Sequence, residues 1–351
     1  MTTATPLSKQ AAVLNHPAVR QPPLKSGVVR RTSSMQVLWS VGDESRYRIV
    51  GRARDVVGKG NPAPEILGEA SIEATIGKDG RIVSLIGDRR QETLAGFGGM
   101  RSGGELRKAV AHELPEEVRG ETLLHRLLDD LAGASFMSTA AWYAWKDGIE
   151  GHSARIGVDS LANRPVEGVC LSYVQGSSSM SAAGQGIEDH ANHPVGPLPL
   201  PIEDRTGFHA LIETDQPNEW RLRRTDIWRE DDELVVDAWF QDSSVIQGNI
   251  AQRVIFHEYG ILAKFDAKTL QLGQIAVSPH VLPYVTCQAA PATAQVLVGR
   301  SAHELRDQVL LHLRGSAGCT HLNDMLRALQ DITVLASSLA AREAAKGSIA
   351  D

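Results

Sequence analysis

The chain has few of the residues that mark several common protein classes. It contains only three cysteines in 351 residues, and they lie far apart at Cys170, Cys287 and Cys319. A disulfide framework is therefore not expected, and free thiols indicate a reducing compartment, which we take to be the cytoplasm. Paired cysteines at short spacing do not occur, so the common structural zinc sites are not expected.

Long apolar runs and an excess of positive charge are lacking as well. No segment is long and apolar enough to predict a transmembrane helix, and the first 29 residues have no apolar core of the kind found in secretory signals. The formal net charge is -6, whereas a general nucleic-acid binder needs a basic face. We therefore expect neither a nucleic acid nor a membrane as a partner.

Motifs for phosphate-bearing cofactors are missing too. The sequence has no Gly-x-x-x-x-Gly-Lys-Ser/Thr run, and its glycine-rich stretch at 96–99 lacks the strand and helix of a dinucleotide site. A Gly-x-Ser-x-Gly elbow does not occur either, which disfavours serine hydrolases of that type. We predict no organic cofactor, and acid–base, thiol or metal-assisted chemistry remains, so a bound metal ion is possible.

The composition that is present is that of a globular protein with a large core. Hydrophobic residues make up 42% of the chain and charged residues 22%, which gives no reason to expect bulk disorder. The stretch 1–29 is rich in Ala, Thr, Pro and Gln, and we interpret it as a mobile arm. Residues 341–351 are interpreted as a C-terminal tail.

Two stretches of the chain repeat one ordered pattern. Each opens on Arg-Arg-Thr, continues through a strand and a hairpin, and ends in two helices that begin alike. The matching parts are 30–32 with 223–225, 47–57 with 234–240, 70–87 with 254–277, 105–107 with 304–306, and 120–122 with 318–320. Such self-similarity indicates a repeated unit. We predict an α+β fold that is a tandem duplication of an antiparallel sheet with helices, packed about a pseudo-twofold axis.

The repeats set the predicted domain boundaries. The first repeat covers 30–150 and the second covers 223–340. A connecting segment at 151–222 is rich in Pro, Ser and Gly, which suit neither helices nor central strands. It is long for a structureless connection in a compact protein. Two interpretations stay open, a passive surface linker and a lid over a site.

The reactive side chains gather in the second repeat. When the repeats are aligned on their hairpin turns and last helices, several of these side chains stand opposite less reactive residues of the first repeat. The pairs are His257 with Ala70, Glu258 with Ser71, Cys319 with Glu121, His321 with Leu123, and Asn323 with His125. This asymmetry predicts a single site near the interface between the repeats.

Each of these residues has a chemical role to offer. His257 and Glu258 are neighbours on a predicted strand, so at most one of them faces any given pocket. Cys319 at a helix N-terminus would have its thiolate favoured by the helix dipole. His321 is a candidate general base or metal ligand. Every one of these side chains could equally be a packed residue with satisfied hydrogen bonds.

Phenols and guanidinium groups complete the candidate list. Tyr259 and Tyr284 can each donate a proton or stabilise an anion, unless they are core aromatics. Three arginines near the reactive residues, Arg223, Arg224 and Arg253, can hold a carboxylate bidentately.

The second half of the chain resembles a bacterial family known only as a domain of unknown function. The resemblance is carried by His257-Glu258-Tyr259, by Leu282-Pro283-Tyr284 with Cys287, and by the run Gly-Cys-Thr-His-Leu-Asn-Asp at 318–324. Weaker matches extend it over about 30–329. Members of that family often have a second Cys-Thr-His-like element, where this chain has Glu121-Thr122-Leu123. The resemblance implies no settled reaction and associates the chain loosely with the breakdown of aromatic and steroid compounds.

These observations favour a cofactor-independent lyase, similar to a decarboxylase, that acts on a small aromatic or alicyclic acid in a catabolic pathway. His321 or His257 would be the general acid–base, Tyr284 or Tyr259 would stabilise negative charge, and Cys319 would position His321. The arginines, Asn323 and Glu258 would bind the substrate. One alternative is a Cys-His hydrolase or thioesterase that uses Cys319 as nucleophile. Another is a non-catalytic small-molecule-binding or accessory protein, and a homo-oligomer is open in each case.

Overall fold

The computed structural model describes residues 16–17, 21–59, 64–157, 167–180, 193–197 and 207–350, except for the side chains at 178 and 346–350. Much of the predicted N-terminal arm lies outside this part of the chain. The same holds for 158–166, 181–192 and 198–206 of the connecting segment. The predicted mobility of the arm, and the choice between linker and lid, therefore stay predictions.

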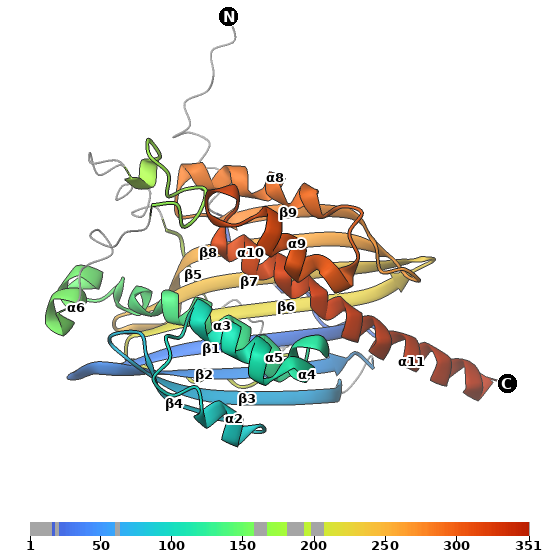
Figure 1. Ribbon diagram of the computed structural model, residues 1–351, viewed down its shortest axis with the longest axis horizontal. Coiled ribbons are helices and arrows are strands. Elements are labelled where there is room, and N and C mark those ends of the chain that lie inside the picture. Colours follow the sequence, from blue (N-terminus) through green and yellow to red (C-terminus); the bar gives the residue numbers. More distant parts are fainter. Residues whose placement is uncertain are drawn as a thin grey trace, which may run out of the picture.

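One antiparallel sheet of nine strands forms the centre of the protein (Figure 1). Its order is β4-β3-β2-β1-β6-β7-β8-β5, and β9 also pairs with β8. The strands are β1 (Val29–Ser40), β2 (Asp43–Val57), β3 (Glu65–Gly77), β4 (Ile82–Gly87), β5 (Val195–Pro197), β6 (Asn218–Glu230), β7 (Glu233–Ile246), β8 (Asn249–Asp266) and β9 (Leu272–Val281). The predicted hairpin turns at 78–80 and 266–268 connect β3 to β4 and β8 to β9, as expected.

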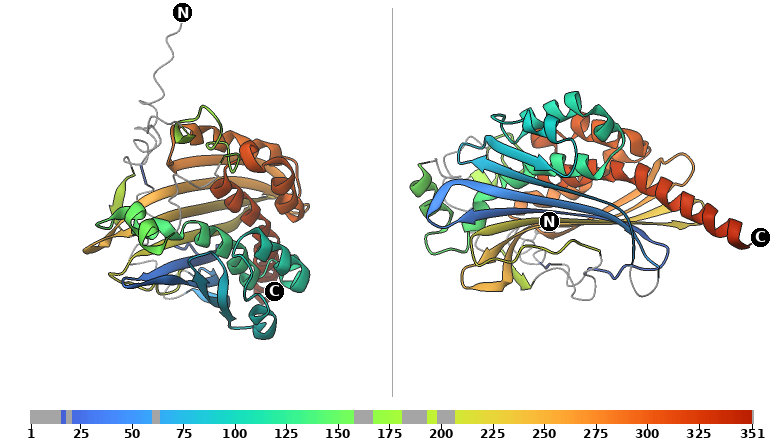
Figure 2. Two further views of the ribbon diagram at one scale, coloured as in Figure 1. Left: turned by 60° about the vertical axis from the view of Figure 1, so that its left-hand side comes forward. Right: turned by 90° about the horizontal axis from the view of Figure 1, so that it is seen from below.

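The larger helices cover one face of this sheet (Figure 2). The α-helices of the described residues are α2 (Gln91–Ala95), α3 (Gly104–Glu113), α4 (Pro115–Arg119), α5 (Leu123–Phe136), α6 (Gly148–Ile156), α8 (Ala290–Thr293), α9 (Leu305–His312), α10 (Thr320–Ala328) and α11 (Ile332–Ala350). The 3-10 turns are η1 (Ser138–Trp142), η3 (Ser178–Met180), η5 (Val285–Ala289), η6 (Ala294–Leu297), η7 (Ala302–Glu304), η8 (Gly315–Ala317) and η9 (Leu329–Asp331). None of the described helices combines the length and apolarity needed to span a membrane.

The α+β prediction is confirmed by this arrangement. Strands β1 to β4 form an antiparallel meander that is followed by helices α2 to α5, and β6 to β9 form a second meander that is followed by α8 to α10. The two meanders join through the antiparallel pair β1–β6. Two boundaries differ from the prediction, because β6 begins at Asn218 and α11 runs through most of the predicted tail.

The last helix of each meander starts close to its predicted position, but the two ends differ in detail. Thr122 is the N-cap of α5, and its hydroxyl accepts a hydrogen bond from the His125 amide. Thr320, by contrast, is already inside α10, and the N-cap is Cys319, which makes no side-chain capping bond. The matched threonines therefore take different positions, because Thr122 is the N-cap of α5 and Thr320 is the first residue of α10.

The core has two large apolar clusters, two smaller ones, and a layer of buried ion pairs. One large cluster belongs mainly to β7–β9 with their helices, and the other to β1–β4 with theirs. Buried arginines and aspartates lie over the central strands and link them to α5 and α10. They are Arg31, Arg126, Arg221, Arg223 and Arg327 with Asp55, Asp129, Asp130, Asp242, Asp324 and Asp331. Since breaking a buried ion pair costs about 3–5 kcal/mol, these pairs fix how both helices dock on the sheet.

Candidate functional site

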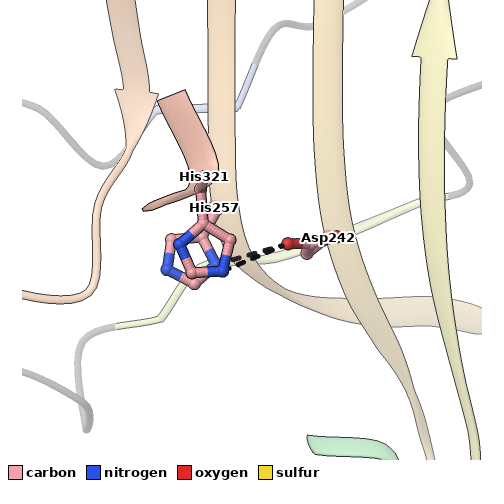
Figure 3. Close-up of side chains that lie close together, drawn as sticks. All are labelled: Asp242, His257 and His321. Atoms are coloured by element: carbon pink, nitrogen blue, oxygen red, sulfur yellow. Dashed lines mark ion pairs between the residues drawn. The ribbon is translucent and has the colours of Figure 1, made fainter. Parts of the chain in front are cut away.

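Three polar side chains from separate elements meet on the helix-covered face of the sheet (Figure 3). Asp242 of β7 and His257 of β8 are register partners, so they stand beside one another on one face. The β7–β8 register shifts directly after this pair, and such bulges commonly re-aim side chains next to sites. His321 comes from the first turn of α10, which packs over these strands.

The three side chains surround a common point and make no hydrogen bonds to each other. His257 Nδ1 lies 3.6 Å and His321 Nε2 lies 3.7 Å from Asp242 Oδ2, which is too long for a hydrogen bond. The two imidazole rings are stacked, with centroids 3.6 Å apart and planes 17° from parallel. One ligand atom of each residue lies within 4.8 Å of the other two. The Asp242 side chain is fully buried, and the histidine side chains are 9% and 11% exposed.

Arg221 holds the carboxylate of this group in place. Its guanidinium donates two hydrogen bonds to Asp242, of 2.9 and 3.0 Å, and a third to Asp324 Oδ2 at 3.0 Å. Burial disfavours ionisation of Asp242, but Arg221 and the two imidazoles outweigh burial and hold the pKa of this carboxyl below its usual value. Asp242 is therefore an anion in the folded protein.

His321 is held as a neutral imidazole. Burial, followed by the nearby charge of His257, lowers its pKa well below the usual value. Its Nδ1 lies 3.4 Å from the Thr320 hydroxyl, which leaves Nε2 directed at Asp242. A neutral imidazole whose second nitrogen has a polar neighbour is the usual form of a metal-binding histidine.

The set of two imidazoles and one carboxylate can hold a divalent metal ion. This donor set is found in catalytic zinc sites and in non-haem iron sites, where it leaves coordination positions open for water or substrate. Sequence comparison of the repeats selected His257 and His321 and missed Asp242. A signal for Asp242 was present, because it belongs to the polar run Gln241-Asp242-Ser243-Ser244 that interrupts the apolar residues of β7, and charged residues are seldom fully buried unless they are paired.

Glu219 of β6 lies next to this group. It is fully buried, and burial together with the charge of Asp242 raises the pKa of its carboxyl well above the usual value. Sequence comparison missed Glu219 as well, since it stands before the predicted start of the second repeat.

Cys319 and Tyr259 face a different neighbourhood. The Cys319 thiol lies 3.5 Å from the Tyr259 hydroxyl, and burial raises the pKa of both groups. The expectation that the helix N-terminus favours the Cys319 thiolate is therefore wrong, because desolvation of the thiol outweighs the dipole. The Cys319 sulfur interacts with the backbone N–H groups of His321 and Leu322, but among the described residues no hydrogen bond is found between this thiol and the His321 imidazole, so the expected role of Cys319 in positioning His321 stays a prediction.

Tyr284 belongs to this thiol and phenol group rather than to the histidine pair. Its hydroxyl lies 3.2 Å from that of Tyr173, and burial raises its pKa. Cys287 is nearby, with its sulfur 2.8 Å from the Ser172 hydroxyl. Burial therefore keeps the phenols of Tyr259 and Tyr284 in their protonated form.

Three predicted substrate-binding residues lie on the opposite face of the sheet. Glu258 accepts a hydrogen bond of 2.6 Å from the Trp239 indole, and the Arg253 guanidinium lies 3.9 Å from the Trp220 ring centre. Arg224 binds Asp226 and Asp237 on that same face. The strands separate all three from His257 and His321. Alternation between faces accounts for Arg224 and Glu258, and the register shift between Asp242 and Ser243 moves Arg253, four residues before His257, to the other face. We therefore withdraw Arg224, Arg253 and Glu258 from the site.

Arg223 and Asn323 remain on the helix-covered face. Arg223 binds Asp130 through Nε at 2.9 Å, and its Nη1 and Nη2 have no hydrogen-bond partner among the described residues. Its guanidinium lies 4.7 Å from the Phe240 ring centre, and that ring is 6.5 Å from the His321 ring. Asn323 donates to the Leu313 carbonyl and so holds the turn before α10.

Comparison with known proteins finds a family model that matches part of this chain. Residues 220–335 match the model of an uncharacterised family. Its description reads "Protein of unknown function (DUF2889)". The matched stretch contains Asp242, His257 and His321, so the resemblance to an uncharacterised domain family is confirmed there, while the first half of the chain is not matched. No curated protein and no solved structure matches the chain.

Proposed function

We propose that this protein is a metal-dependent enzyme that acts on a small organic acid, with Asp242, His257 and His321 as the metal ligands. One observation carries the proposal. Three buried ligand atoms, contributed by two strands and a helix, lie within 4.8 Å of one another. Packing alone rarely gathers two imidazoles and a carboxylate at one buried point.

The distances favour a bound ion over a proton relay. A relay needs hydrogen bonds of about 2.6–3.2 Å between its members, whereas both imidazole nitrogens are at least 3.6 Å from the carboxylate. In addition, His257 Nδ1 is buried with no hydrogen-bond partner in the described part of the chain. A divalent ion between the three atoms would satisfy that nitrogen and the carboxylate together.

The reaction we propose remains a lyase reaction of the decarboxylase type on an aromatic or alicyclic acid, now assisted by a metal. A divalent ion acts as a Lewis acid and stabilises the negative charge that develops when a carbon–carbon bond breaks. The free Nη atoms of Arg223 support an acid as substrate, because a guanidinium can hold a carboxylate with two parallel hydrogen bonds.

The thiol-based alternative has less support. A Cys-His hydrolase needs a thiolate within hydrogen-bond reach of a base, and burial raises the pKa of Cys319. A non-catalytic binding protein stays an outcome of the test below. We keep the cytoplasm as the proposed compartment, because the three cysteines are free thiols.

We also propose that the two meanders arose by duplication of one unit. Arg31 and Arg221 support this, because each forms an ion pair with the residue opposite it on the neighbouring strand. Arg31 of β1 pairs with Asp55 of β2, and Arg221 of β6 pairs with Asp242 of β7. The Arg-Arg-Thr match instead pairs Arg31 with Arg224, whose side chain is on the other face, so Arg221 is the better counterpart. A relative that consists of one unit should form a dimer through the strand equivalent to β1, and a one-unit relative that stays monomeric would contradict the proposal.

Metal binding tests the proposed function first. The purified chain should contain about one equivalent of a divalent transition metal by mass spectrometry, and the stripped protein should rebind Zn²⁺, Mn²⁺ or Co²⁺. His257→Ala and His321→Ala should each lower the affinity for the metal by more than about 100-fold. Loss of a residue that only supports a ligand typically lowers it by about 10–100-fold, so a larger loss indicates a direct ligand. His112→Ala is the matched control, because its side chain is 83% exposed on α3.

Turnover tests the reaction. The metal-loaded protein should release carbon dioxide from at least one acid in a panel of aromatic and alicyclic carboxylic acids, and the stripped protein should not. Binding of the acids without turnover would favour the non-catalytic alternative. Failure of the wild type to bind any of the metals would overturn the proposed function.

A further inference from the structure

We propose that Glu219 is the outer carboxylate of this centre, and that it accepts a hydrogen bond from a water on the metal ion. The inference rests on the proposed function, because it needs a metal at Asp242, His257 and His321. Glu219 would not bind the metal directly. Its role would be to hold the water or the substrate group that reacts at the metal.

Glu219 is placed by the register of β6 and β7. It faces Ser244 across the strand pair, and Arg221, two residues further along β6, faces Asp242. Residues two apart on a strand share a face, so Glu219 stands on the helix-covered face beside Asp242. The charge of Asp242 acts on Glu219, as their proximity requires.

The polar groups around Glu219 lack partners. Glu219 and Ser244 are fully buried, and neither carboxylate oxygen of Glu219 has a hydrogen-bond donor among the described residues. The same is true of Ser244 Oγ and of His257 Nδ1. More than about 90% of buried polar groups in folded proteins have a partner, so a carboxylate and two further groups without partners on this face indicate that something polar binds between them.

Charge points to a cation with its water as that occupant. Arg221 already binds Asp242 and Asp324, and among the described residues no cation is hydrogen-bonded to Glu219. Burial and Asp242 therefore favour the uncharged form of Glu219 when no ion is bound, whereas a nearby cation would favour its carboxylate form. A buried carboxylate without such a partner costs several kcal/mol in general, and a divalent ion nearby removes that penalty. The ligand atoms of Asp242, His257 and His321 lie within 4.8 Å of one another, and Glu219 does not belong to this group of described residues. It therefore reaches the ion through a water and is not a direct ligand.

Groups of this kind affect metal sites strongly. A carboxylate that binds a metal-bound water orients it and raises the affinity of the site for the ion, and loss of such a partner typically weakens binding by about 10–100-fold. Ser244, opposite Glu219, can hydrogen bond to the same water through its hydroxyl.

The test compares Glu219→Gln with Glu258→Gln. Both residues are glutamates with fully buried side chains, but Glu258 lies on the other face of the sheet and binds Trp239. The affinity of the stripped proteins for Zn²⁺ and Co²⁺ is measured by calorimetry, and their thermal unfolding is followed without metal. We expect Glu219→Gln to bind metal about 10–100-fold more weakly than the wild type. Its metal-free unfolding temperature should be close to that of the wild type, because burial and Asp242 favour the uncharged form of Glu219 when no ion is bound.

Glu258→Gln should behave in the opposite way, with wild-type metal affinity and a lower unfolding temperature. Metal affinity of Glu219→Gln within twofold of the wild type would overturn the inference and leave the proposed function intact. Absence of metal binding by the wild type would overturn both. If Glu219→Gln does not fold, Glu219→Asp serves instead, because the shorter carboxylate should weaken binding, and unchanged affinity in that variant would also overturn the inference.

Discussion

Gly133 in the last turn of α5 gives the sharpest test of how the ionic layer is built. Arg221 passes directly beneath this glycine, and a Cβ added at Gly133 would lie 1.6 Å from Arg221 Nη1 and 2.9 Å from Asp324 Oδ2. The Arg221 guanidinium has no free direction to move, because it binds Asp242 and Asp324 at the same time. Gly133→Ala should therefore displace Arg221 from both carboxylates.

The sign of this effect follows from two magnitudes. Replacing a glycine inside a helix with alanine ordinarily stabilises the helix by about 1 kcal/mol. Separating a buried arginine from its carboxylates costs about 3–5 kcal/mol. Gly133→Ala should thus lower the free energy of unfolding by about 2–4 kcal/mol, and it should weaken metal binding because Asp242 loses its anchor.

Urea unfolding of the metal-free proteins measures this change. Gly104→Ala is the matched control, because Gly104 is also helical, in α3, and nothing lies within 4 Å of its added Cβ. The control should be as stable as the wild type or more stable, by up to about 1 kcal/mol. If Gly133→Ala is as stable as this control, then Arg221 does not run beneath α5 as described.

Three further predictions concern the buried charges and thiols. Asp331→Asn should make the free energy of unfolding less dependent on pH in acid. Burial raises the pKa of Asp331, but the charges of Arg126 and Arg31 outweigh burial and lower this pKa from 3.8 to about 2. A lowered pKa gives stability that is fully present above pH 4 and is lost as the pH falls toward 2, so acid titration of unfolding should show a loss of about 2 kcal/mol in the wild type that is absent from the variant. Cys170, Cys287 and Cys319 should react slowly with a thiol reagent at pH 8 until the protein unfolds, because burial raises their pKa values; fast labelling of Cys319 in the folded protein would revive the nucleophile hypothesis. Asp242→Asn should abolish metal binding and also lower unfolding stability by about 3–5 kcal/mol, since Arg221 loses its bidentate partner; a variant that keeps wild-type affinity would contradict the ligand assignment.

Local patterns in the sequence predicted several elements of the fold, but β1 and β6, which join the two meanders, were recognised only as the Arg-Arg-Thr openings of the repeats. Period-two alternation and turn residues located the hairpins at 78–80 and 266–268, and helical periodicity located α3, α5, α9 and α10. These features depend on residues close together in the chain. The comparison of the two repeats also selected His257 and His321, which the structure brings together.

Pairings between distant residues could not be predicted in the same way. Asp242 becomes part of the site only because β7 lies between β6 and β8, and because Arg221 of β6 fixes its carboxylate. The choice of face was a second limit. Alternation predicts that Arg223 and Arg224 point in opposite directions, but it does not say which face the helices cover.

The extent of burial around a side chain was the third feature that the sequence did not predict. The N-terminal position of Cys319 on α10 was identified, but the helix dipole was taken as decisive for the thiol. Desolvation depends on how tightly Tyr259 and its neighbours enclose the sulfur, and that information exists only in the packed structure.

The most direct test of the account is an anomalous-scattering map from crystals of the metal-loaded protein, collected at the absorption edge of the bound metal. We predict one peak within about 2.0–2.2 Å of Asp242 Oδ2, His257 Nδ1 and His321 Nε2. Crystals soaked in metal that show no peak there, with the three side chains still more than 3.5 Å apart, would contradict the metal centre proposed for this protein.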